Sequence, residues 1–160
     1  MIGLISDTHD NVENVKKAVE LFQKHDVDFV LHLGDVVAPA TIKFFSGLVL
    51  KVIKGNCDGD IEGMKRMLSN INGEYLGEEH TFRLGGKKIY ATHGIDEKKL
   101  GEIIRSKKYD YVLHGHTHFK RDEKIKNTRV INPGAQYWGS EHTIVLFDPK
   151  IDRVEFISLK

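Results

Sequence analysis

Five short apolar runs in this sequence each stop at polar residues that are able to bind a metal ion. The run "IGLIS" leads to Asp7 and His9, and the run "FVLHLG" leads to Asp35. The later runs lead in the same way to four more residues, which are Asn56, His93, His116 and His118. In an open α/β sheet, ligands collect at the carboxyl ends of the strands, so this repetition predicts one pocket lined by all seven residues.

The seven residues offer imidazole nitrogen, carboxylate oxygen and amide oxygen, and they include no cage of thiolates. This donor set suits borderline divalent metals. One ion is saturated by about four to six such groups, so seven candidates fit two ions that share a carboxylate. Two metals about 3.5–4 Å apart activate water and stabilise the charge of a phosphoryl transition state, which indicates phosphate-ester chemistry.

The elements that must position these residues alternate in the first half of the chain. Short apolar strands alternate with amphipathic helices, which are expected over residues 10–25, 42–45 and 61–70. Strands and helices in alternation predict a mainly parallel sheet with helices packed against it.

The pattern changes from residue 74 onward. The stretch "TFRLGGKKIYATHG" predicts a hairpin closed by Gly85 and Gly86, a helix is expected over residues 96–107, and "YDYVLHG" predicts a strand. Short strands and turns follow to the end of the chain. No linker, repeat or low-complexity segment divides the sequence, so we expect one domain, residues 1–160, with two sheets.

Composition narrows the classes of function. The chain has 160 residues, of which 40% are hydrophobic and 29% charged, and this length is sufficient for a real core. Its formal net charge of +1 gives no argument for nucleic acid or a membrane surface as a partner. The single cysteine, Cys57, excludes an intrachain disulfide, and the opening "MIGLISD" lacks the features of a signal peptide, so a cytoplasmic location is expected.

The order of the polar residues resembles the signature of the calcineurin-like metallophosphoesterases, which is D-x-H, G-D, G-N-x-D, H and G-H-x-H. The matching blocks here are Asp7-Thr8-His9, Gly34-Asp35, Gly55-Asn56-Cys57-Asp58, His93-Gly94 and Gly115-His116-Thr117-His118. The resemblance extends from residue 5 to about residue 135. The small size and the "INPGA" stretch are similar to the short bacterial and archaeal phosphodiesterase subgroup.

The resemblance implies an α/β fold in which two mixed β-sheets pack face to face between outer helices, a four-layer αββα sandwich. It implies that one metal is held by Asp7, His9, Asp35 and His118, and a second by Asp35, Asn56, His93 and His116. The implied enzyme is a dinuclear-metal-dependent phosphodiesterase in which a metal-bridging hydroxide attacks a small phosphodiester, while Asn56 and His93 hold the phosphate oxygens. Manganese is the metal expected first, and nickel, iron, cobalt and zinc accept the same donors.

Two residues, one in a motif block and one beside a block, leave alternatives open. Cys57 stands where many family members have a histidine that protonates the leaving oxygen, and a thiol, with an unperturbed pKa of about 8.5, is a poor substitute. Asp58, which would pair with that histidine, is retained and is counted as catalytic with Asn56 and His93. The favoured interpretation is that Cys57 only fills its loop, with a redox-sensitive or metal-binding role as the alternative. His114 shares strand parity with the GHTH histidines, but a supporting role is preferred to a ligand role.

The alternative function is a catalytically weak scaffold or binding module, which resembles a relative in membrane-coat trafficking complexes. Retention of all seven ligand positions argues against it. A DNA nuclease is disfavoured, because the chain has neither an added capping domain nor a basic surface. The expected partner is therefore a small phosphodiester substrate, with no nucleic acid and no membrane, and a homo-oligomer is left open.

Overall fold

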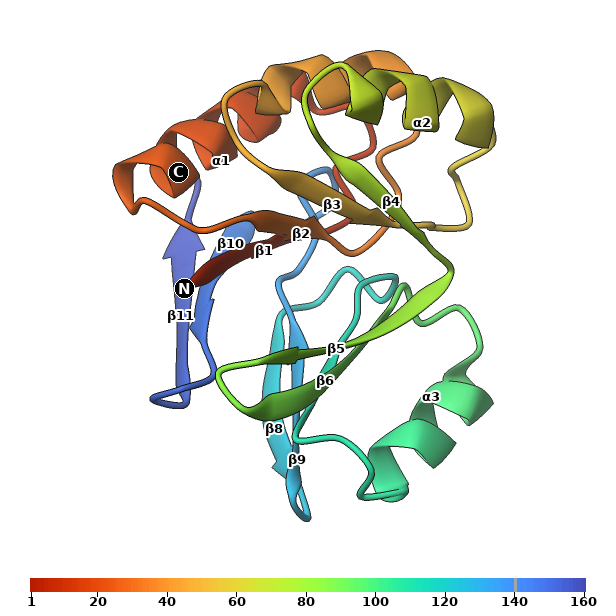
Figure 1. Ribbon diagram of the computed structural model, residues 1–160, viewed down its shortest axis with the longest axis vertical. Coiled ribbons are helices and arrows are strands. Elements are labelled where there is room, and N and C mark those ends of the chain that lie inside the picture. Colours follow the sequence, from red (N-terminus) through yellow and green to blue (C-terminus); the bar gives the residue numbers. More distant parts are fainter. Residues whose placement is uncertain (140) are drawn as a thin grey trace.

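The computed structural model describes residues 1–139 and 141–160, and it contains two β-sheets packed face to face with helices on their outer faces (Figure 1). The first sheet has six strands in the order β11-β10-β1-β2-β3-β4. Strands β1 to β4 are parallel to one another, and β10 is antiparallel to β1. The bounds of these strands are Ile2–Ile5 (β1), Val30–His32 (β2), Leu50–Ile53 (β3), Glu74–Gly77 (β4), Thr143–Asp148 (β10) and Arg153–Ser158 (β11).

The second sheet has five strands in the order β5-β6-β7-β9-β8, and its three central strands are parallel. Gly85 and Gly86 close the β5–β6 hairpin with φ of 59° and 81°, which confirms the predicted turn, because a type I′ turn needs positive φ at both central residues. The bounds of these strands are Glu79–Leu84 (β5), Lys87–Thr92 (β6), Tyr111–Leu113 (β7), Arg121–Ile125 (β8) and Thr128–Asn132 (β9).

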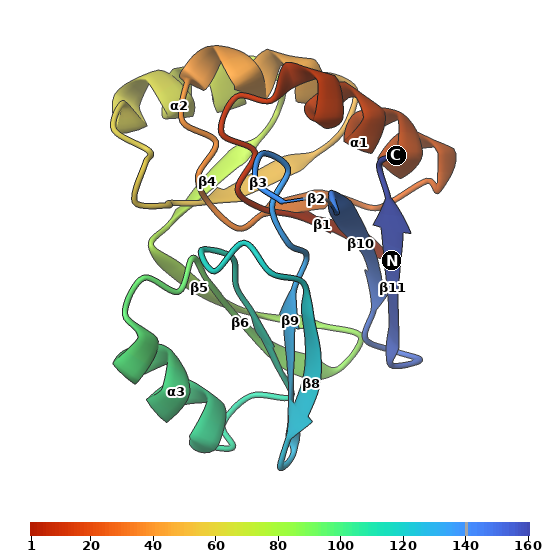
Figure 2. The same ribbon diagram turned by 180° about the vertical axis from the view of Figure 1, so that it is seen from behind.

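Three helices cover the outer face of the first sheet, and one covers the second (Figures 1 and 2). Helix α1, Val12–Lys24, begins at Asn11, whose side chain accepts a hydrogen bond from the Asn14 N–H. The predicted short helix is a longer 3₁₀ helix, because Pro39 fixes a helical φ at its start. The bounds of the other helices are Pro39–Phe45 (η1), Ile61–Ser69 (α2) and Glu97–Arg105 (α3).

The change of pattern expected at residue 74 does not coincide with the change of sheet. Strand β4 pairs in parallel with β3 and so still belongs to the first sheet. The chain passes to the second sheet between Gly77, which has a φ of 86°, and Glu79. A single residue therefore separates the two sheets along the chain.

The core between the sheets fixes how their strand ends meet. Strand β1, "IGLI", is buried along its whole length, as expected for a parallel strand covered on both faces. The fully buried side chains that meet between the sheets include Leu4, Leu31 and Leu33 from the first sheet, and Ile89, Leu113 and Ile131 from the second. Burial of each such side chain contributes roughly 1.5–3 kcal/mol, so the two sheets are held in a fixed relation. The predicted fold class, with helices outside two mixed sheets, is confirmed.

None of the helices in the described part of the chain is long and apolar enough to cross a membrane.

Candidate metal centre

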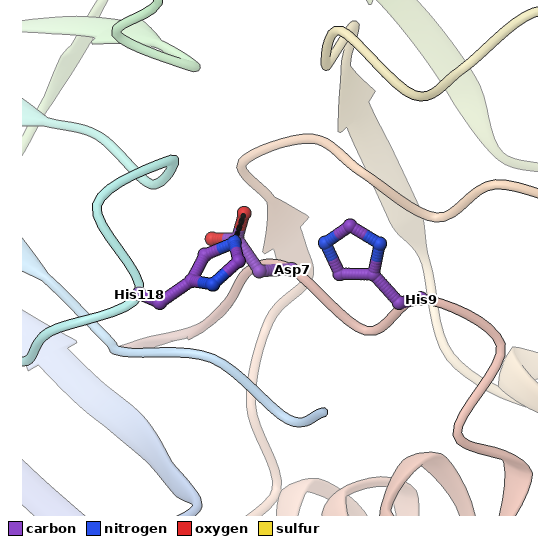
Figure 3. Close-up of side chains that lie close together, drawn as sticks. All are labelled: Asp7, His9 and His118. Atoms are coloured by element: carbon purple, nitrogen blue, oxygen red, sulfur yellow. Dashed lines mark ion pairs between the residues drawn. The ribbon is translucent and has the colours of Figure 1, made fainter. Parts of the chain in front are cut away.

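Asp7 and His9 lie in the segment that follows β1, and both have left-handed backbone conformations, with φ of 52° and 40°. Figure 3 shows the His118 imidazole reaching from a separate segment toward the Asp7 carboxylate. The distance from His118 Nε2 to Asp7 Oδ1 is 3.3 Å. The second Asp7 oxygen, Oδ2, accepts a hydrogen bond of 3.1 Å from the backbone N–H of His116. Asp7, which is fully buried, thus joins the first sheet's loop to the GHTH segment.

Asp35 follows β2 and lies between histidines from both sheets. Its Oδ2 is 3.4 Å from His9 Nε2 and 3.4 Å from His93 Nε2. Its other oxygen, Oδ1, accepts a 2.8 Å hydrogen bond from the backbone N–H of Cys57. One carboxylate oxygen is therefore fixed by the protein backbone, and the other faces two imidazoles.

His93 lies beside Asp35, and Asn56 and His116 lie beside His93. His93 Nδ1 donates a 2.7 Å hydrogen bond to the backbone carbonyl of Leu33, so in neutral His93 the free lone pair is on Nε2. That Nε2 is 3.1 Å from the amide oxygen of Asn56. The rings of His93 and His116 are 5.2 Å apart between centroids. These three residues thus lie in one neighbourhood, but among the described residues His116 is in none of the groups whose ligand atoms lie within 4.8 Å of one another.

The electrostatics of the cluster suit bound cations. Burial raises the pKa of Asp7. Burial also opposes ionisation of Asp35, but hydrogen bonds from His93 and the Cys57 N–H hold its pKa below the usual range. For His93, burial alone would lower the pKa, yet the neighbouring carboxylates of Asp35 and Asp7 raise it. The two buried carboxylates lie 3.3–3.4 Å from imidazole nitrogens, and a positive charge between these groups would stabilise them.

The orphaned atoms point to the same conclusion. Asp7 Oδ1 and His9 Nε2 are buried and make no hydrogen bond with any described residue. Asp7, His9 and His118 present ligand atoms within 4.8 Å of one another, and so do Asp7, Asp35 and His93. Ligand atoms of one transition-metal ion lie within about 4–4.5 Å of each other, so these groups are close to the required spacing. The side chains fit divalent transition metals with nitrogen and oxygen ligands.

Comparison with known proteins gives the family. A family model described as the calcineurin-like phosphoesterase superfamily domain matches residues 1–151. The chain belongs to this superfamily. Its five motif blocks thus predicted the family correctly, and the family assigns the chain to the phosphoesterase hydrolases.

Several relatives extend the calcineurin-like phosphoesterase assignment. A phosphodiesterase of Methanocaldococcus jannaschii is 38% identical over 136 residues, which cover 83% of this chain and 82% of that protein. A solved structure described as a novel archaeal phosphodiesterase has a TM-score of 0.92 at 34% identity, over 98% of each chain. A solved structure of Vps29 from Entamoeba histolytica, described as complexed with zinc, has a TM-score of 0.68 at 17% identity over 99% of each chain, which shows a shared fold alone.

Asp58 and Cys57, which are neighbours in the loop after β3, differ in exposure. Asp58 is 2% exposed, and its two oxygens accept backbone hydrogen bonds from Asp35, Val37 and Gly55, at 3.1, 2.8 and 2.7 Å. These contacts give Asp58 the task of positioning the ligand loops. Cys57 is exposed, and its sulfur lies within 4.8 Å of the nearest ligand atoms of His9 and Asp35. Burial and the Asp35 charge raise the pKa of Cys57 to about 11.

Glycine at two loop positions permits the close approach of the ligands. A Cβ at Gly55 would lie 2.1 Å from Asp35 Oδ1, and a Cβ at Gly115 would lie 1.9 Å from Ser6 Oγ and 2.8 Å from Asp7 Oδ2. Glycine at position 115 therefore leaves room for Ser6 and Asp7.

Two further histidines near the predicted metal ligands are buried and neutral. His114 is 1% exposed, its Nδ1 donates to the backbone carbonyl of Gly115 at 2.9 Å, and burial lowers its pKa to about 4. The ligand groups found among the described residues do not include it. His32, whose pKa burial also lowers to about 4, lies 3.0 Å from the Thr8 hydroxyl. It therefore supports the residue between Asp7 and His9.

The aromatic residue Tyr137 is a neighbour of the site that sequence reasoning missed. Its ring centroid is 5.7 Å from that of His9. Tyr137 follows the "NPGA" turn and lies outside the five motif blocks, and no periodic pattern marks it. Only the tertiary path of the chain between β9 and β10 brings it to the predicted metal ligands.

Proposed function

We propose that this phosphoesterase is a dinuclear-metal-dependent phosphodiesterase that hydrolyses a small phosphodiester. The observation that carries the proposal is the position of Asp35. A single oxygen of Asp35 is 3.4 Å from both His9 Nε2 and His93 Nε2, and these imidazoles belong to the two different predicted ligand sets. A carboxylate oxygen between two such sets suits a bridge between two ions.

The residues proposed to hold the first ion are Asp7, His9, Asp35 and His118, and those for the second are Asp35, Asn56, His93 and His116. When bound, two divalent ions stabilise negative charge on the phosphoryl oxygens and lower the pKa of water, so that hydroxide is available near neutral pH. We place manganese first among the metals that accept these donors.

The chain's own residues would orient the phosphate and keep the centre in shape. The His93 ring is fixed by its bond to the Leu33 carbonyl, so its Nε2 keeps one direction. Asn56 is exposed, and its side-chain amide offers a donor to a phosphate oxygen. Asp58 holds the backbone on both sides of Asp35.

The preference for a diester is supported by the relatives that are named phosphodiesterases. The net charge of +1 favours a small substrate over a polyanion such as nucleic acid. The exposed thiol of Cys57 beside the ligands suits a reducing, cytoplasmic location. A thiol with a pKa near 11 is a poor proton donor, so we expect substrates with acidic leaving groups to react best.

The experiment is to strip the purified protein with a chelator, restore single metals, and measure metal content together with hydrolysis of bis(p-nitrophenyl) phosphate. We expect about two ions per chain and restored turnover, with manganese most effective. Turnover that survives complete chelation, or saturation at one ion with full activity, would contradict the proposal. Stoichiometric metal with no turnover would favour the scaffold function instead.

A further inference from the structure

A cavity of about 480 Å³ opens beside the candidate metal centre. It lies between the segment that follows the GHTH block and the segment that joins β9 to β10. His118 lines this cavity and is also 3.3 Å from Asp7, so the cavity and the metal centre share a wall. Its volume is within the range of about 300–1,000 Å³ typical of small-molecule sites.

Exposed aromatic side chains gather around this cavity. Phe119 and Trp138 line it and are 79% and 65% exposed, and the adjacent Tyr137 is 56% exposed. Of the large hydrophobic side chains exposed in the described part of the chain, the aromatic ones are these three. Apolar side chains that gather on a surface in this way mark a binding site.

The rings form a continuous series from the metal ligands to the cavity. The centroid distances are 5.5 Å from His118 to His9, 5.7 Å from His9 to Tyr137, and 6.4 Å from Tyr137 to Trp138. A substrate with its phosphate at the metal ligands would therefore bring a neighbouring substituent against Trp138 and Phe119.

Buried hydrogen bonds fix the backbone that carries these rings. The Gln136 N–H donates to the carbonyl of Asp7 at 3.0 Å, and the Gln136 carbonyl accepts from the side chains of Asn11 and Asn14, at 2.9 and 2.8 Å. Gln136, which is fully buried, also donates from its side chain to the Thr143 carbonyl. Figure 2 shows this segment turned toward the chain between β1 and α1. Tyr137 and Trp138 thus start from a backbone fixed to a metal-ligand loop.

The rim of the cavity is polar and carries no excess charge. Lys120 and Glu141 line the cavity and pair with each other at 2.6 Å. Such a rim offers one donor and one acceptor to the edge of a ring, and it does not favour a second anion. The cavity therefore suits a flat, uncharged ring that carries polar atoms on its edge.

We infer that this cavity binds the heteroaromatic ring of the substrate, so that the phosphodiester carries a nucleobase-like substituent that stacks on Trp138 and Phe119. This inference rests on the proposed function, since the phosphate must lie at the metal ligands. Aromatic side chains bind any base through its π-face, and a polar rim adds modest selectivity. The substrate class is then a nucleotide diester of low molecular weight.

The test uses the metal-loaded full chain and two ligands that differ only in the base, AMP and ribose 5-phosphate. Trp138 is the only tryptophan in the chain, so its fluorescence reports on the cavity alone. We expect AMP to quench this fluorescence saturably, and ribose 5-phosphate to leave it unchanged. By calorimetry, AMP should bind about tenfold or more tightly than ribose 5-phosphate, given the usual effect of stacking one base.

Variants show whether the base is bound by an aromatic ring or only by an apolar side chain of similar volume. Trp138→Leu should bring AMP down to the affinity of ribose 5-phosphate, Trp138→Phe should keep most of the preference, and Phe119→Ala should lose part of it. Ile151→Ala is the control, because Ile151 is also exposed, at 69%, but lies in the turn after β10, at the end of the first sheet away from Asp7. It should leave both affinities unchanged.

Equal affinity for the two ligands, or an AMP preference that survives Trp138→Leu, would overturn the inference. If the protein also hydrolyses a diester, the proposed function stands without it. A preference for AMP without turnover would keep the ligand class and overturn the proposed reaction. Failure of both ligands to bind would overturn the inference, while turnover of the diester would still decide the proposed function.

Discussion

The two sheets contribute different chemistry to the candidate metal centre. The loops of the first sheet carry Asp7, His9, Asp35 and Asn56, whereas those of the second sheet carry only imidazoles, those of His93, His116 and His118. The carboxylates are almost fully buried, while the His118 side chain is 30% exposed. The first sheet thus provides the fixed negative charge. The second sheet provides imidazoles, which no longer bind metal once they are protonated. We expect the two sides to fail in different ways.

The largest effect is expected from the carboxylate that both predicted ligand sets share. Asp35→Asn should lower turnover at least about a hundredfold, because it weakens both ions at once. Bound metal and turnover should be measured together. Asp26→Asn is the matched control, because Asp26 also has a left-handed φ, 48° against 59° for Asp35, and is exposed away from the site. Equal losses in the two variants would mean that the backbone conformation, and not the ligand, is responsible.

The histidines of the second sheet should make the centre sensitive to acid. The carboxylates of Asp35 and Asp7 raise the pKa of His93 against the effect of its burial, and metal binding needs the neutral imidazole. Protons should therefore begin to compete with metal at a pH above the ordinary histidine pKa of about 6.5. Below that pKa, activity should fall roughly tenfold for each pH unit. Metal content measured across the same range checks this. Lost activity with both ions retained would contradict it.

The same group has the opposite effect on the stability of the chelated protein. A raised pKa for His93 stabilises the fold fully below pH of about 6.5, and this contribution is lost as pH rises through the raised value. The melting temperature of the chelated protein should therefore fall as pH rises through the raised pKa of His93. The metal-loaded protein should become more stable over the same pH range. If the melting temperature of the metal-free protein rose over this pH range, His93 would not be the dominant group.

A smaller effect on metal binding is expected from Asp58, which holds the ligand loops of the first sheet. Asp58→Asn replaces one acceptor oxygen by a donor that faces backbone N–H groups, so we expect about a tenfold loss in metal affinity and turnover. Asp60→Asn is the control, because Asp60 caps α2 from the same segment without contacting the ligand loops. If excess metal restored no activity to Asp58→Asn, a direct role in the reaction would be indicated instead.

Cys57→His tests the one departure from the family pattern. A histidine beside the retained Asp58 would supply an acid, and general acid catalysis is worth about 10²–10⁴-fold when geometry is ideal. We expect a gain of roughly tenfold or less, confined to diesters with poor leaving groups. Rates for a series of diesters of graded leaving-group pKa check this in both proteins. A shallow dependence in the native protein would show that another group already supplies the proton.

The smallest effect on turnover is expected at His114. His114→Ala should change turnover only a few-fold, because the buried ring supports the Gly115 carbonyl. It should still lower stability by about 1–3 kcal/mol, since the Gly115 carbonyl loses its donor and the buried ring leaves a cavity. Denaturant unfolding beside kinetics separates the two effects. A loss comparable to that of Asp35→Asn would mean that the ligands have been misassigned.

The sequence predicted what depends on local pattern. The strand ends at Asp7 and Asp35 followed from apolar runs, because a strand that stops at a polar residue leaves it at the sheet edge. The pairing of β10 with β1 joins Ile2 to Phe147, and no local periodicity reports on a contact of that separation. The same limit hid Tyr137, whose place depends on Gln136 and its bonds to the start of α1. The spacing of the motifs identifies the candidate ligands, whereas the tertiary structure determines which other residues lie beside them.

The left-handed backbone at the ligand loops bears on how this protein can change over generations. Five of the predicted ligands have positive φ, between 40° and 67°, which are Asp7, His9, Asp35, His116 and His118. Such conformations cost non-glycine residues of order 1–2 kcal/mol each. At His116 and His118, glycine would relieve that cost and remove a ligand in the same step. Selection for thermal stability alone would therefore erode catalysis before it eroded the fold, and stable but inactive descendants are the easiest ones for this sequence to produce.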